Sequence, residues 1–304
     1  MAYINILRKN IYYEIYGITN EAVLLYLHGG PGASCLDFVN AAETLSKELQ
    51  VISFDQYGVL RSDAIAENEP YSMELQADMI EEMRRKLNIK CWSVLGHSYG
   101  GALAVFYANK YPDSVDKIIL ECPSLNFADS AKSIAAYVSD YINQTRDSSA
   151  IEHCQKMQNF DYQNCDVLVE LIKLLGYVKD MKLRNYLHGI SFEEYMASFS
   201  TAEITNDMWP KSEKHLSNLL KDGAIVDNYL PVLRDLNKPT LLLKGKYDPV
   251  CSNNQTQYIK GLSNATVIEF DNSGHFPRIE DAEKYIEAIL KFFTNQSSLI
   301  SQKE

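Results

Sequence analysis

The sequence predicts an α/β fold, a mostly parallel sheet with helices on both faces, and two observations support this prediction. Short apolar runs, such as Val23–Leu27 and Trp92–Leu95, stop at glycine-rich turns. Segments with helical spacing follow, as in Leu36–Leu49 and Ala102–Asn109. This alternation is typical of a sheet whose strands are buried on both sides by helices. A chain of 304 residues is also long enough to bury a large core without metal or disulfide staples.

The first half of the chain follows this alternation. Ile4–Leu7 and Ile11–Tyr16 have no helix between them, so we expect an antiparallel hairpin at the edge of the sheet. Val51–Phe54 and Ile118–Leu120 are expected to be further strands. Ser72 is expected to cap the helix between them. The apolar stripe of that helix consists of Leu75, Met79, Met83 and Leu87.

The alternation stops after about Pro123, and residues 124–236 contain no convincing strand. Apolar spacing in this stretch predicts several helices instead. The residues concerned are Ile134, Val138, Tyr141, Val167, Leu171, Leu174, Leu187, Tyr195, Leu216 and Leu219. The stretch is too long for a simple connection. We therefore expect a helical segment, residues 125–236, inserted into a sheet domain made of residues 1–124 and 237–304.

The sheet pattern resumes after the insertion. Pro239–Leu243 and Thr266–Phe270 have strand character, and a final helix is expected over about Asp281–Phe293. A polar tail, Asn295–Glu304, follows it. The sheet domain is thus expected to be assembled from both ends of the chain.

Composition excludes several classes of function. Lys plus Arg is 29 and Asp plus Glu is 40, so the net charge is −11, which disfavours nucleic acid or an anionic membrane as a partner. Met1–Asn10 lacks the apolar core of an export signal, and no apolar run approaches the roughly 18 residues of a membrane span. The six cysteines are scattered, without a CxxC pair. We expect a cytoplasmic protein without disulfides, zinc or another cofactor.

Gly96-His97-Ser98-Tyr99-Gly100 forms a G-x-S-x-G box between an apolar strand and a helix. This is the context of a nucleophile elbow, in which the glycines permit a sharp turn and the serine stands at the end of the strand. Taken alone, the same residues also fit a glycine-rich turn with a helix-capping serine. A catalytic serine also needs a histidine as base and an acid that orients the histidine, so the presence of these two residues decides between the interpretations.

An acid and a histidine follow in the expected order. Asp248 and His275 each lie in a turn just beyond an apolar strand. Carboxyl ends of parallel strands meet at one edge of the sheet, so Ser98, Asp248 and His275 are expected to converge there. Either of the last two, taken alone, would read as a solvated turn carboxylate or a capping histidine. Glu121, just beyond another strand, is kept as an alternative acid.

The glycine-rich run His28-Gly29-Gly30-Pro31-Gly32 closes an earlier strand. We assign the oxyanion hole to the N–H groups of Gly30 and Tyr99, the residue after the nucleophile. His28 is expected to brace this loop, with a second catalytic base as the alternative, and His97 is expected to be a packing residue. The small-molecule or short-peptide substrate should lie between this edge and the inserted helical segment. The residues expected to bind it are Gly29, Phe38, Tyr57, Trp209 and Phe276, with core packing as the alternative for each aromatic ring.

These motifs resemble the α/β-hydrolase superfamily and, within it, the prolyl iminopeptidase family of serine peptidases. The resemblance is carried by His28–Gly32, by Asp55-Gln56-x-Gly58-x-x-Arg61-Ser62-Asp63, by Gly96–Gly101, by Asp248 and by Gly274-His275. It spans about Tyr3–Ser124 and Pro239–Phe293. It implies that the helical insertion is the cap domain of this fold.

Two departures bear on the substrate. Tyr57 and Leu60 stand where the family has Arg and Gly, and Pro249 stands where some members carry a Glu that helps bind the substrate ammonium. A desolvated ammonium needs a carboxylate partner, so the cap would have to supply it. The candidates are Glu193, Glu194, Glu203, Asp207 and Glu213.

Three functions follow from these residues. The first is a serine hydrolase that releases the N-terminal residue of a small peptide, as the resemblance implies. The second is an esterase or lactonase on the same scaffold, which Pro249 favours. The third is a non-catalytic binding protein, against which the complete set of catalytic motifs argues.

Overall fold

The structure is a computed structural model that describes residues 2–18, 22–145, 147–162, 166–178, 186–199 and 204–294. Eight strands form one sheet in the order β1-β2-β4-β3-β5-β6-β7-β8. The hairpin of β1 and β2 is antiparallel and joins β4 in antiparallel fashion, whereas all later neighbours are parallel. The strands are β1 (Ala2–Ile6), β2 (Lys9–Tyr16), β3 (Val23–Leu27), β4 (Gln50–Phe54), β5 (Trp92–His97), β6 (Val115–Glu121), β7 (Thr240–Gly245) and β8 (Ala265–Phe270).

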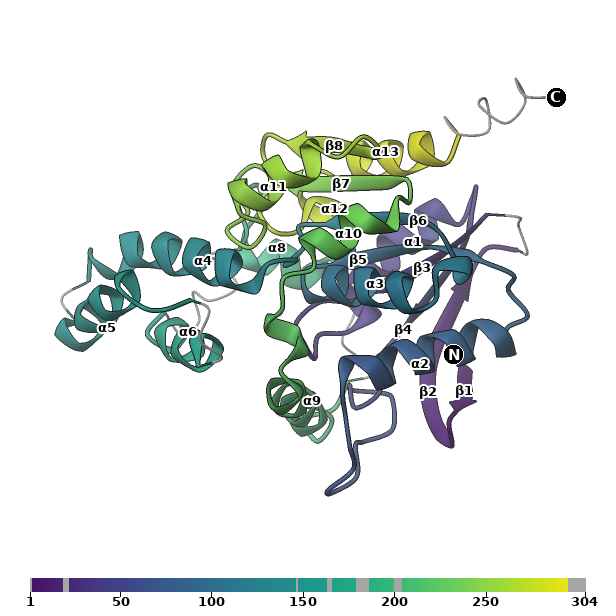
Figure 1. Cartoon of the computed structure of the whole chain (residues 1–304), viewed down its shortest axis with the longest axis horizontal. Coiled ribbons are helices and arrows are strands. Elements are labelled where there is room, and N and C mark those ends of the chain that lie inside the picture. The colour runs from purple at the N-terminus through teal and green to yellow at the C-terminus, as the bar shows by residue number, and fades with distance from the viewer. Residues whose placement is uncertain are drawn as a thin grey trace.

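Helices cover both faces of the sheet (Figure 1). The helices of the sheet domain are α1 (Val39–Leu45), α2 (Met73–Lys86), α3 (Tyr99–Lys110), α10 (Leu230–Leu236), α11 (Asn253–Lys260), α12 (Pro277–Glu280) and α13 (Ala282–Thr294). Successive side chains of β3 enter opposite cores. Leu25 and Leu27 pack in the core that α2, α3 and α10 cover, and Leu24 and Tyr26 pack in the core that α1 and α13 cover. The apolar strands in the sequence are therefore buried on both faces, as predicted.

Part of the inserted segment forms an arm to one side of the sheet domain (Figure 1). The arm consists of α4 (Phe127–Ile142), α5 (Ser148–Gln158) and α6 (Val167–Gly176), whereas α8 (Phe192–Ala197) and α9 (Trp209–Asp222) lie against the sheet domain. α4, α5 and α6 share a small apolar core of their own, which also includes Val250 from the turn after β7. Through Val250, this core contacts the sheet domain near the carboxyl ends of the strands.

The structure confirms the expected edge hairpin and the capping role of Ser72, whose hydroxyl accepts a hydrogen bond from the Leu75 amide at 3.1 Å. α10, at the end of the predicted insertion, packs on α3 and α11, with Leu230 and Leu233 in the sheet core. The predicted tail, Asn295–Glu304, lies outside the described residues.

None of the helices in the described ranges is both long enough and apolar enough to span a bilayer.

Candidate active site

Ser98 stands at the turn between β5 and α3 with backbone angles φ 54° and ψ −121°. This region is costly for a residue with a Cβ, so the surrounding structure must impose it. The two flanking glycines allow that turn. A Cβ on Gly96 would lie 2.2 Å from the Gly100 carbonyl oxygen, and a Cβ on Gly100 would lie 2.1 Å from the Leu27 carbonyl oxygen. The G-x-S-x-G spacing is therefore a packing requirement of this strand-to-helix turn.

Asp248 and His275 lie in the turns after β7 and β8, and they are in direct contact. His275 Nδ1 donates to Asp248 Oδ1 at 2.8 Å. The Asp248 carboxylate also accepts from the amides of Val250 and Cys251, each at 2.9 Å. These bonds fix the carboxylate, and the carboxylate in turn fixes the orientation of the imidazole.

The pKa of Asp248 lies below its ordinary value, although burial alone would raise it. The opposing causes are the His275 ring, which interacts by charge and by hydrogen bond, the ammonium of Lys244 and the Val250 amide. Lys244 Nζ lies 3.8 Å from Asp248 Oδ2. Asp248 is therefore a carboxylate at neutral pH, able to stabilise an imidazolium beside it.

The loop after β3 lies against the Ser98 turn. A Cβ on Gly29 would come within 2.9 Å of the Ser98 Cβ, and Gly30 has φ 111°, where glycine is favoured. Tyr99 is the first residue of α3, so its N–H has no carbonyl of a preceding turn to bind. The amides of Gly30 and Tyr99 are thus both available at the wall of one cavity.

Buried polar groups brace this loop from behind. The Gln56 amide N–H donates to His28 Nε2 at 3.0 Å, so the Nδ1 of this neutral ring carries the proton and faces the Gly29 carbonyl at 3.0 Å. Burial lowers the pKa of His28, which keeps the ring neutral. Asp55 accepts from the Ser34 hydroxyl at 2.5 Å and from Arg61 Nε at 2.6 Å. The Asp55-Gln56 motif therefore has a bracing function, and His28 is a bracing residue, as expected.

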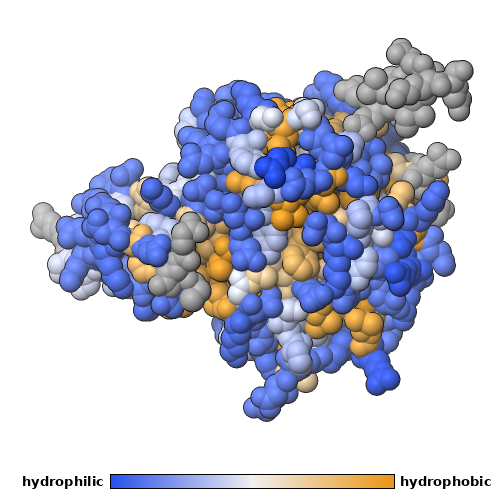
Figure 2. Space-filling view, viewed as in Figure 1, coloured by the Kyte–Doolittle hydropathy of each residue, from blue (hydrophilic) through white to orange (hydrophobic). Residues whose placement is uncertain are grey.

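A cavity of about 330 Å³ lies between this edge of the sheet and the cap. Ser98, His275, Gly29, Gly30 and Phe276 all line it, so it brings together the predicted nucleophile, base and oxyanion loop. Its other walls are mostly apolar. They include Phe127, Ile134, Leu168, Leu171, Ile172, Leu175, Tyr186, Tyr195, Ile225 and Val250. In the space-filling view, apolar surface is visible where the arm meets the sheet domain (Figure 2).

Three of the predicted substrate-binding residues lie outside this cavity. Phe38 is fully buried and stacks on Tyr26, with ring centroids 3.9 Å apart. Tyr57 is buried and donates to Glu69 at 2.6 Å, away from Ser98. Trp209, at the start of α9, is 47% exposed and is not among the cavity's lining residues. Phe38 and Tyr57 are packing residues and Trp209 is a surface residue, and the sequence pattern does not distinguish either kind from a pocket wall.

Two residues of the cavity wall that the sequence did not indicate, Tyr186 and Tyr195, belong to the inserted segment. Tyr186 lies beside His275, with ring centroids 5.2 Å apart, and its carbonyl accepts the His275 amide at 2.7 Å. Tyr195 packs on Phe276 with ring centroids 4.9 Å apart. Neither residue sits in a motif, and only the path of the cap brings them to the site.

The structure places Glu121, the alternative acid, against Arg278 and Tyr285. Its carboxylate lies 2.9 Å from Arg278 Nη1 and accepts from the Tyr285 hydroxyl at 3.0 Å, and burial raises its pKa. His97 is buried beside His275 and Phe276, at ring-centroid distances of 4.6 and 5.2 Å, and burial holds its pKa well below the ordinary value. His97 therefore packs against the proposed base, and Glu121 forms a buried ion pair with Arg278.

The cap carboxylates proposed for ammonium binding do not line the cavity where they are described. Glu194 closes a capping box with Ser191, and Asp207 accepts from the Thr205 hydroxyl at 2.5 Å. Glu193 and Glu213 are also absent from the cavity wall, and Glu203 lies outside the described residues. Among the described residues that line the cavity, the one carboxylate is that of Asp37, which pairs with Arg278.

Among the described residues, one group could present three ligands to a metal ion: Cys122, Asp248 and His275, with ligand atoms within 4.8 Å of one another. Two of these atoms already bind each other, as His275 Nδ1 and Asp248 Oδ1. Burial raises the pKa of the Cys122 thiol well above its ordinary value, so a neutral thiol lies beside this pair. The arrangement fits an acid–base pair better than a metal site.

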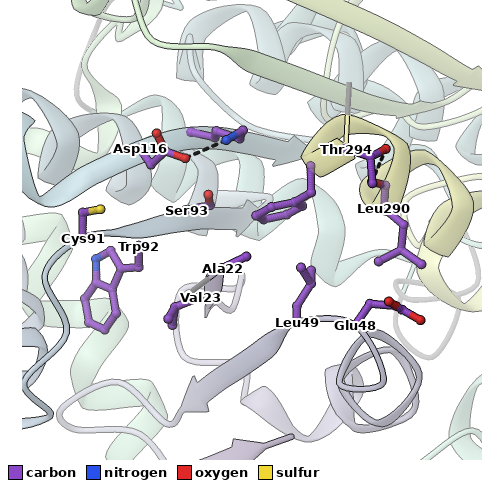
Figure 3. A pocket seen from close by; sticks show the side chains of 12 residues that line it. Ala22, Val23, Glu48, Leu49, Cys91, Trp92, Ser93, Asp116, Leu290 and Thr294 are labelled. Atoms are coloured by element: carbon purple, nitrogen blue, oxygen red, sulfur yellow. Dashed lines mark hydrogen bonds and ion pairs between the residues drawn. The ribbon is translucent and has the colours of Figure 1, made fainter. Parts of the chain in front are cut away.

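A second cavity, of about 510 Å³, lies at the opposite edge of the sheet (Figure 3). Its wall includes Val23, Leu49, Trp92 and Leu290, at the beginnings of the strands and the end of α13. None of the predicted catalytic residues reaches it. The candidate chemistry is confined to the carboxyl edge, as expected for a parallel sheet.

Comparison with known proteins agrees with this geometry. A family model described as the alpha/beta hydrolase fold matches residues 22–282. A proline iminopeptidase of Saccharolobus solfataricus is 28% identical over 299 residues, which cover 95% of this chain and 91% of that protein. A proline iminopeptidase of Heyndrickxia coagulans is 25% identical and covers 90% of each chain.

Solved structures share the fold at lower identity. An esterase from Thermogutta terrifontis superposes with a TM-score of 0.69 at 18% identity, covering 97% of this chain and 98% of that one. The enol-lactonase from Burkholderia xenovorans LB400 superposes with a TM-score of 0.66 at 17% identity, covering 96% and 100%.

Proposed function

Because the chain belongs to the α/β-hydrolase fold family and is a hydrolase, we propose that Ser98, His275 and Asp248 are its catalytic triad. One observation carries this proposal above the others. His275 lines the same cavity as the strained Ser98 turn, and its Nδ1 lies 2.8 Å from Asp248 Oδ1 behind the cavity wall. A buried carboxylate, an oriented imidazole and a hydroxyl at a helix N-terminus are the components of nucleophilic acyl transfer.

The chemistry follows from these positions. Ser98 Oγ attacks the substrate carbonyl carbon while His275 Nε2 takes the hydroxyl proton, and Asp248 stabilises the imidazolium that forms. The amides of Gly30 and Tyr99 donate to the oxyanion, and loss of one such donor typically costs about 10²–10³ in rate. His275 then gives its proton to the leaving oxygen or nitrogen as that bond breaks. Water, deprotonated by His275, hydrolyses the acyl-enzyme and restores Ser98.

The substrate we propose first is a small peptide that loses its N-terminal residue. The supporting observation is that proline iminopeptidases align with this chain over nearly its full length. An apolar cavity of about 330 Å³ is large enough for a proline ring and its neighbour. Asp37 is the lining carboxylate that the ammonium of such a peptide would meet.

A second candidate is hydrolysis of an ester or lactone. Two observations favour it: Pro249 follows Asp248, and Arg278 already pairs with the lining carboxylate Asp37. A neutral ester needs no carboxylate in the cavity, whereas a desolvated ammonium does. The apolar walls contributed by α4 and α6 suit the acyl group of such a substrate.

One set of assays distinguishes the two substrates. We expect purified enzyme to cleave proline 4-nitroanilide, and N-acetylation of that substrate should abolish cleavage if the ammonium is recognised. Turnover of 4-nitrophenyl butyrate without cleavage of the anilide would support the ester instead. Ser98→Ala should lose activity on either substrate and keep its circular dichroism spectrum. Wild-type rates in Ser98→Ala would refute the proposed function.

A further inference from the structure

The carboxylate of Glu280, at the end of the short helix α12, joins the cap to the loop that carries His275. Its Oε2 accepts the amides of Gly274 at 2.8 Å and Phe276 at 3.2 Å, on either side of the histidine. Its Oε1 accepts the amides of His188 at 2.6 Å and Gly189 at 3.1 Å. One side chain therefore binds four backbone donors from two segments far apart in the sequence.

The cap segment that Glu280 holds, Tyr186–Gly189, also contacts both catalytic turns directly. The Tyr186 carbonyl accepts the His275 amide at 2.7 Å. The His188 ring stacks on Tyr247, the residue before Asp248, with centroids 3.4 Å apart and planes 13° apart. This segment, which we call the docking segment, thus touches the turns of the base and of the acid.

The fit between the docking segment and the histidine turn leaves little free space. A Cβ on Gly274 would lie 2.3 Å from the Tyr186 carbonyl oxygen. A Cβ on Gly189 would lie 2.5 Å from the Asn272 carbonyl oxygen. A shift of the segment would therefore be transmitted to residues 272–276, because no gap absorbs it.

Hydrogen bonds from amides to a carboxylate are stronger than those to a neutral acceptor. Because Glu280 shares its two oxygens between the loops, loss of its charge would weaken the hold on both at once. Displacement of a catalytic group by about 1 Å can cost on the order of 10² in rate. The position of His275 therefore depends on a side chain that does not contact the substrate cavity.

We propose that Glu280 is a positioning residue that couples the seating of the cap to the alignment of His275. The inference rests on the proposed function, because it takes His275 as the base. Glu280 acts only through the backbone of the docking segment and of the histidine turn. The cap, through this link, contributes to the rate of the chemical step as well as to substrate binding.

The first experiment compares Glu280→Gln with Glu283→Gln, an exposed carboxylate three residues further along the chain. Turnover of 4-nitrophenyl butyrate, or of proline 4-nitroanilide if only that is cleaved, is measured per site titrated with a fluorophosphonate. We expect Glu280→Gln to lower kcat by about 10- to 100-fold, with KM changed by less than about 3-fold. Glu283→Gln should match the wild type. Unchanged kcat per titrated site in Glu280→Gln would overturn the proposal.

The second experiment breaks the cap side of the link and leaves Glu280 intact. Gly189→Ala forces the docking segment away from Asn272, whereas Gly176→Ala, in the cap at the end of α6, has no atom within 4 Å of the added Cβ. We expect Gly189→Ala to lower kcat by about 3- to 10-fold, and Gly176→Ala to leave it unchanged. Wild-type kcat in Gly189→Ala would contradict the coupling, and this variant decides the matter if Glu280→Gln does not fold.

The double variant tests whether both changes act through one link. If they do, Glu280→Gln with Gly189→Ala should be no slower than Glu280→Gln alone, whereas independent effects would multiply. If the two losses in kcat multiply, Glu280 acts on the histidine turn independently of the docking segment, which would contradict the coupling. The outcomes also separate this inference from the proposed function. Turnover in Ser98→Ala defeats the proposed function, whereas an inactive Ser98→Ala with unimpaired Glu280 and Gly189 variants defeats only the inference.

Discussion

The turns at the carboxyl edge of the sheet and the helices of the cap differ in how tightly their backbones pack. A Cβ would meet a backbone oxygen at 2.2 Å on Gly96, 2.1 Å on Gly100 and 1.8 Å on Gly245. In the cap, a Cβ on Gly176 or Gly223 would meet nothing within 4 Å. The sheet edge therefore holds the groups proposed to react in tightly packed turns, whereas these two positions of the inserted segment have room for an added side chain.

This difference in packing leads us to expect separate effects on the chemical step and on substrate binding. The groups proposed to make and break bonds lie on turns in which a glycine cannot be replaced without a clash. Such tight packing holds a site in a productive geometry. Many of the apolar side chains that line the cavity lie on α4 and α6, where neighbouring positions are exposed. Changes at the sheet edge should therefore affect kcat, and changes on the arm should mainly affect KM.

The largest effect is expected at the sheet edge from Asp248→Asn. An amide in place of the carboxylate cannot stabilise the imidazolium and favours the wrong tautomer of His275, so kcat should fall by about 10⁴-fold. Asp271→Asn, an exposed carboxylate in the neighbouring turn, is the control and should have wild-type kcat. A fall of less than tenfold in Asp248→Asn would assign the acid to another residue.

The next effect tests the tightness of the turn itself. Gly100→Ala places a Cβ on the Leu27 carbonyl oxygen and should displace the Ser98 turn, with a loss of about 10² in kcat or a failure to fold. Gly261→Ala has its nearest contact at 3.4 Å and should retain both activity and melting temperature. Equal kcat and equal melting temperature in the two variants would contradict the explanation of the G-x-S-x-G spacing by packing.

His215 tests how the cap is held on the sheet domain as the pH changes. This buried residue of α9 contacts the Tyr71 hydroxyl at 2.7 Å and the Tyr57 carbonyl at 2.9 Å, and burial lowers its pKa to about 3. The unfolded chain binds a proton near pH 6.5, but the folded chain does not until about pH 3. Stability attributable to His215 is therefore complete above pH 6.5 and is lost as the pH falls toward 3.

The measurement is urea unfolding at pH 7 and at pH 5 for the wild type and for His215→Gln. Between these values the wild type should lose about 2 kcal/mol more of its free energy of unfolding than the variant, at roughly 1.4 kcal/mol per pH unit below 6.5. The buried His28 and His97, whose pKa values are also lowered, remain in both proteins. Identical losses in the two proteins would show that α9 does not depend on a neutral His215.

The smallest effect is expected on the arm. Ile172→Ala removes apolar surface from the cavity wall and should raise KM about 3-fold, with kcat unchanged. Val169→Ala is the matched control, since Val169 is on the same helix, is exposed and does not line the cavity. A large fall in kcat for Ile172→Ala would extend the catalytic requirement into the arm and weaken the comparison.

The sequence predicted the fold class and the elements near the catalytic motifs, because local rules determine them. A buried strand followed by a glycine-rich turn indicates that Ser98 is a candidate nucleophile. The same pattern, which is weaker at the other two positions, indicates Asp248 and His275 as the candidate acid and base. These three residues need only a position at the end of a strand. The parallel order of the strands then brings them to one edge.

The cavity wall was predicted less well, because it depends on how the cap packs. Phe276 lines the cavity, but Phe38, Tyr57 and Trp209 do not. Tyr186, in a turn, and Tyr195, in α8, were missed, since no local pattern distinguishes a residue that faces a cavity from one that faces a core. The four amides bound by Glu280 could not be predicted either, because backbone donors leave no trace in the sequence.

The central claim is that Ser98 is a nucleophile activated by His275, and labelling with a fluorophosphonate tests it most directly. We predict that intact mass and peptide mapping will find one adduct, on Ser98. The adduct should be absent in Ser98→Ala and should form much more slowly in His275→Ala. Labelling at another residue, or equally fast labelling of Ser98 without the imidazole, would contradict the account.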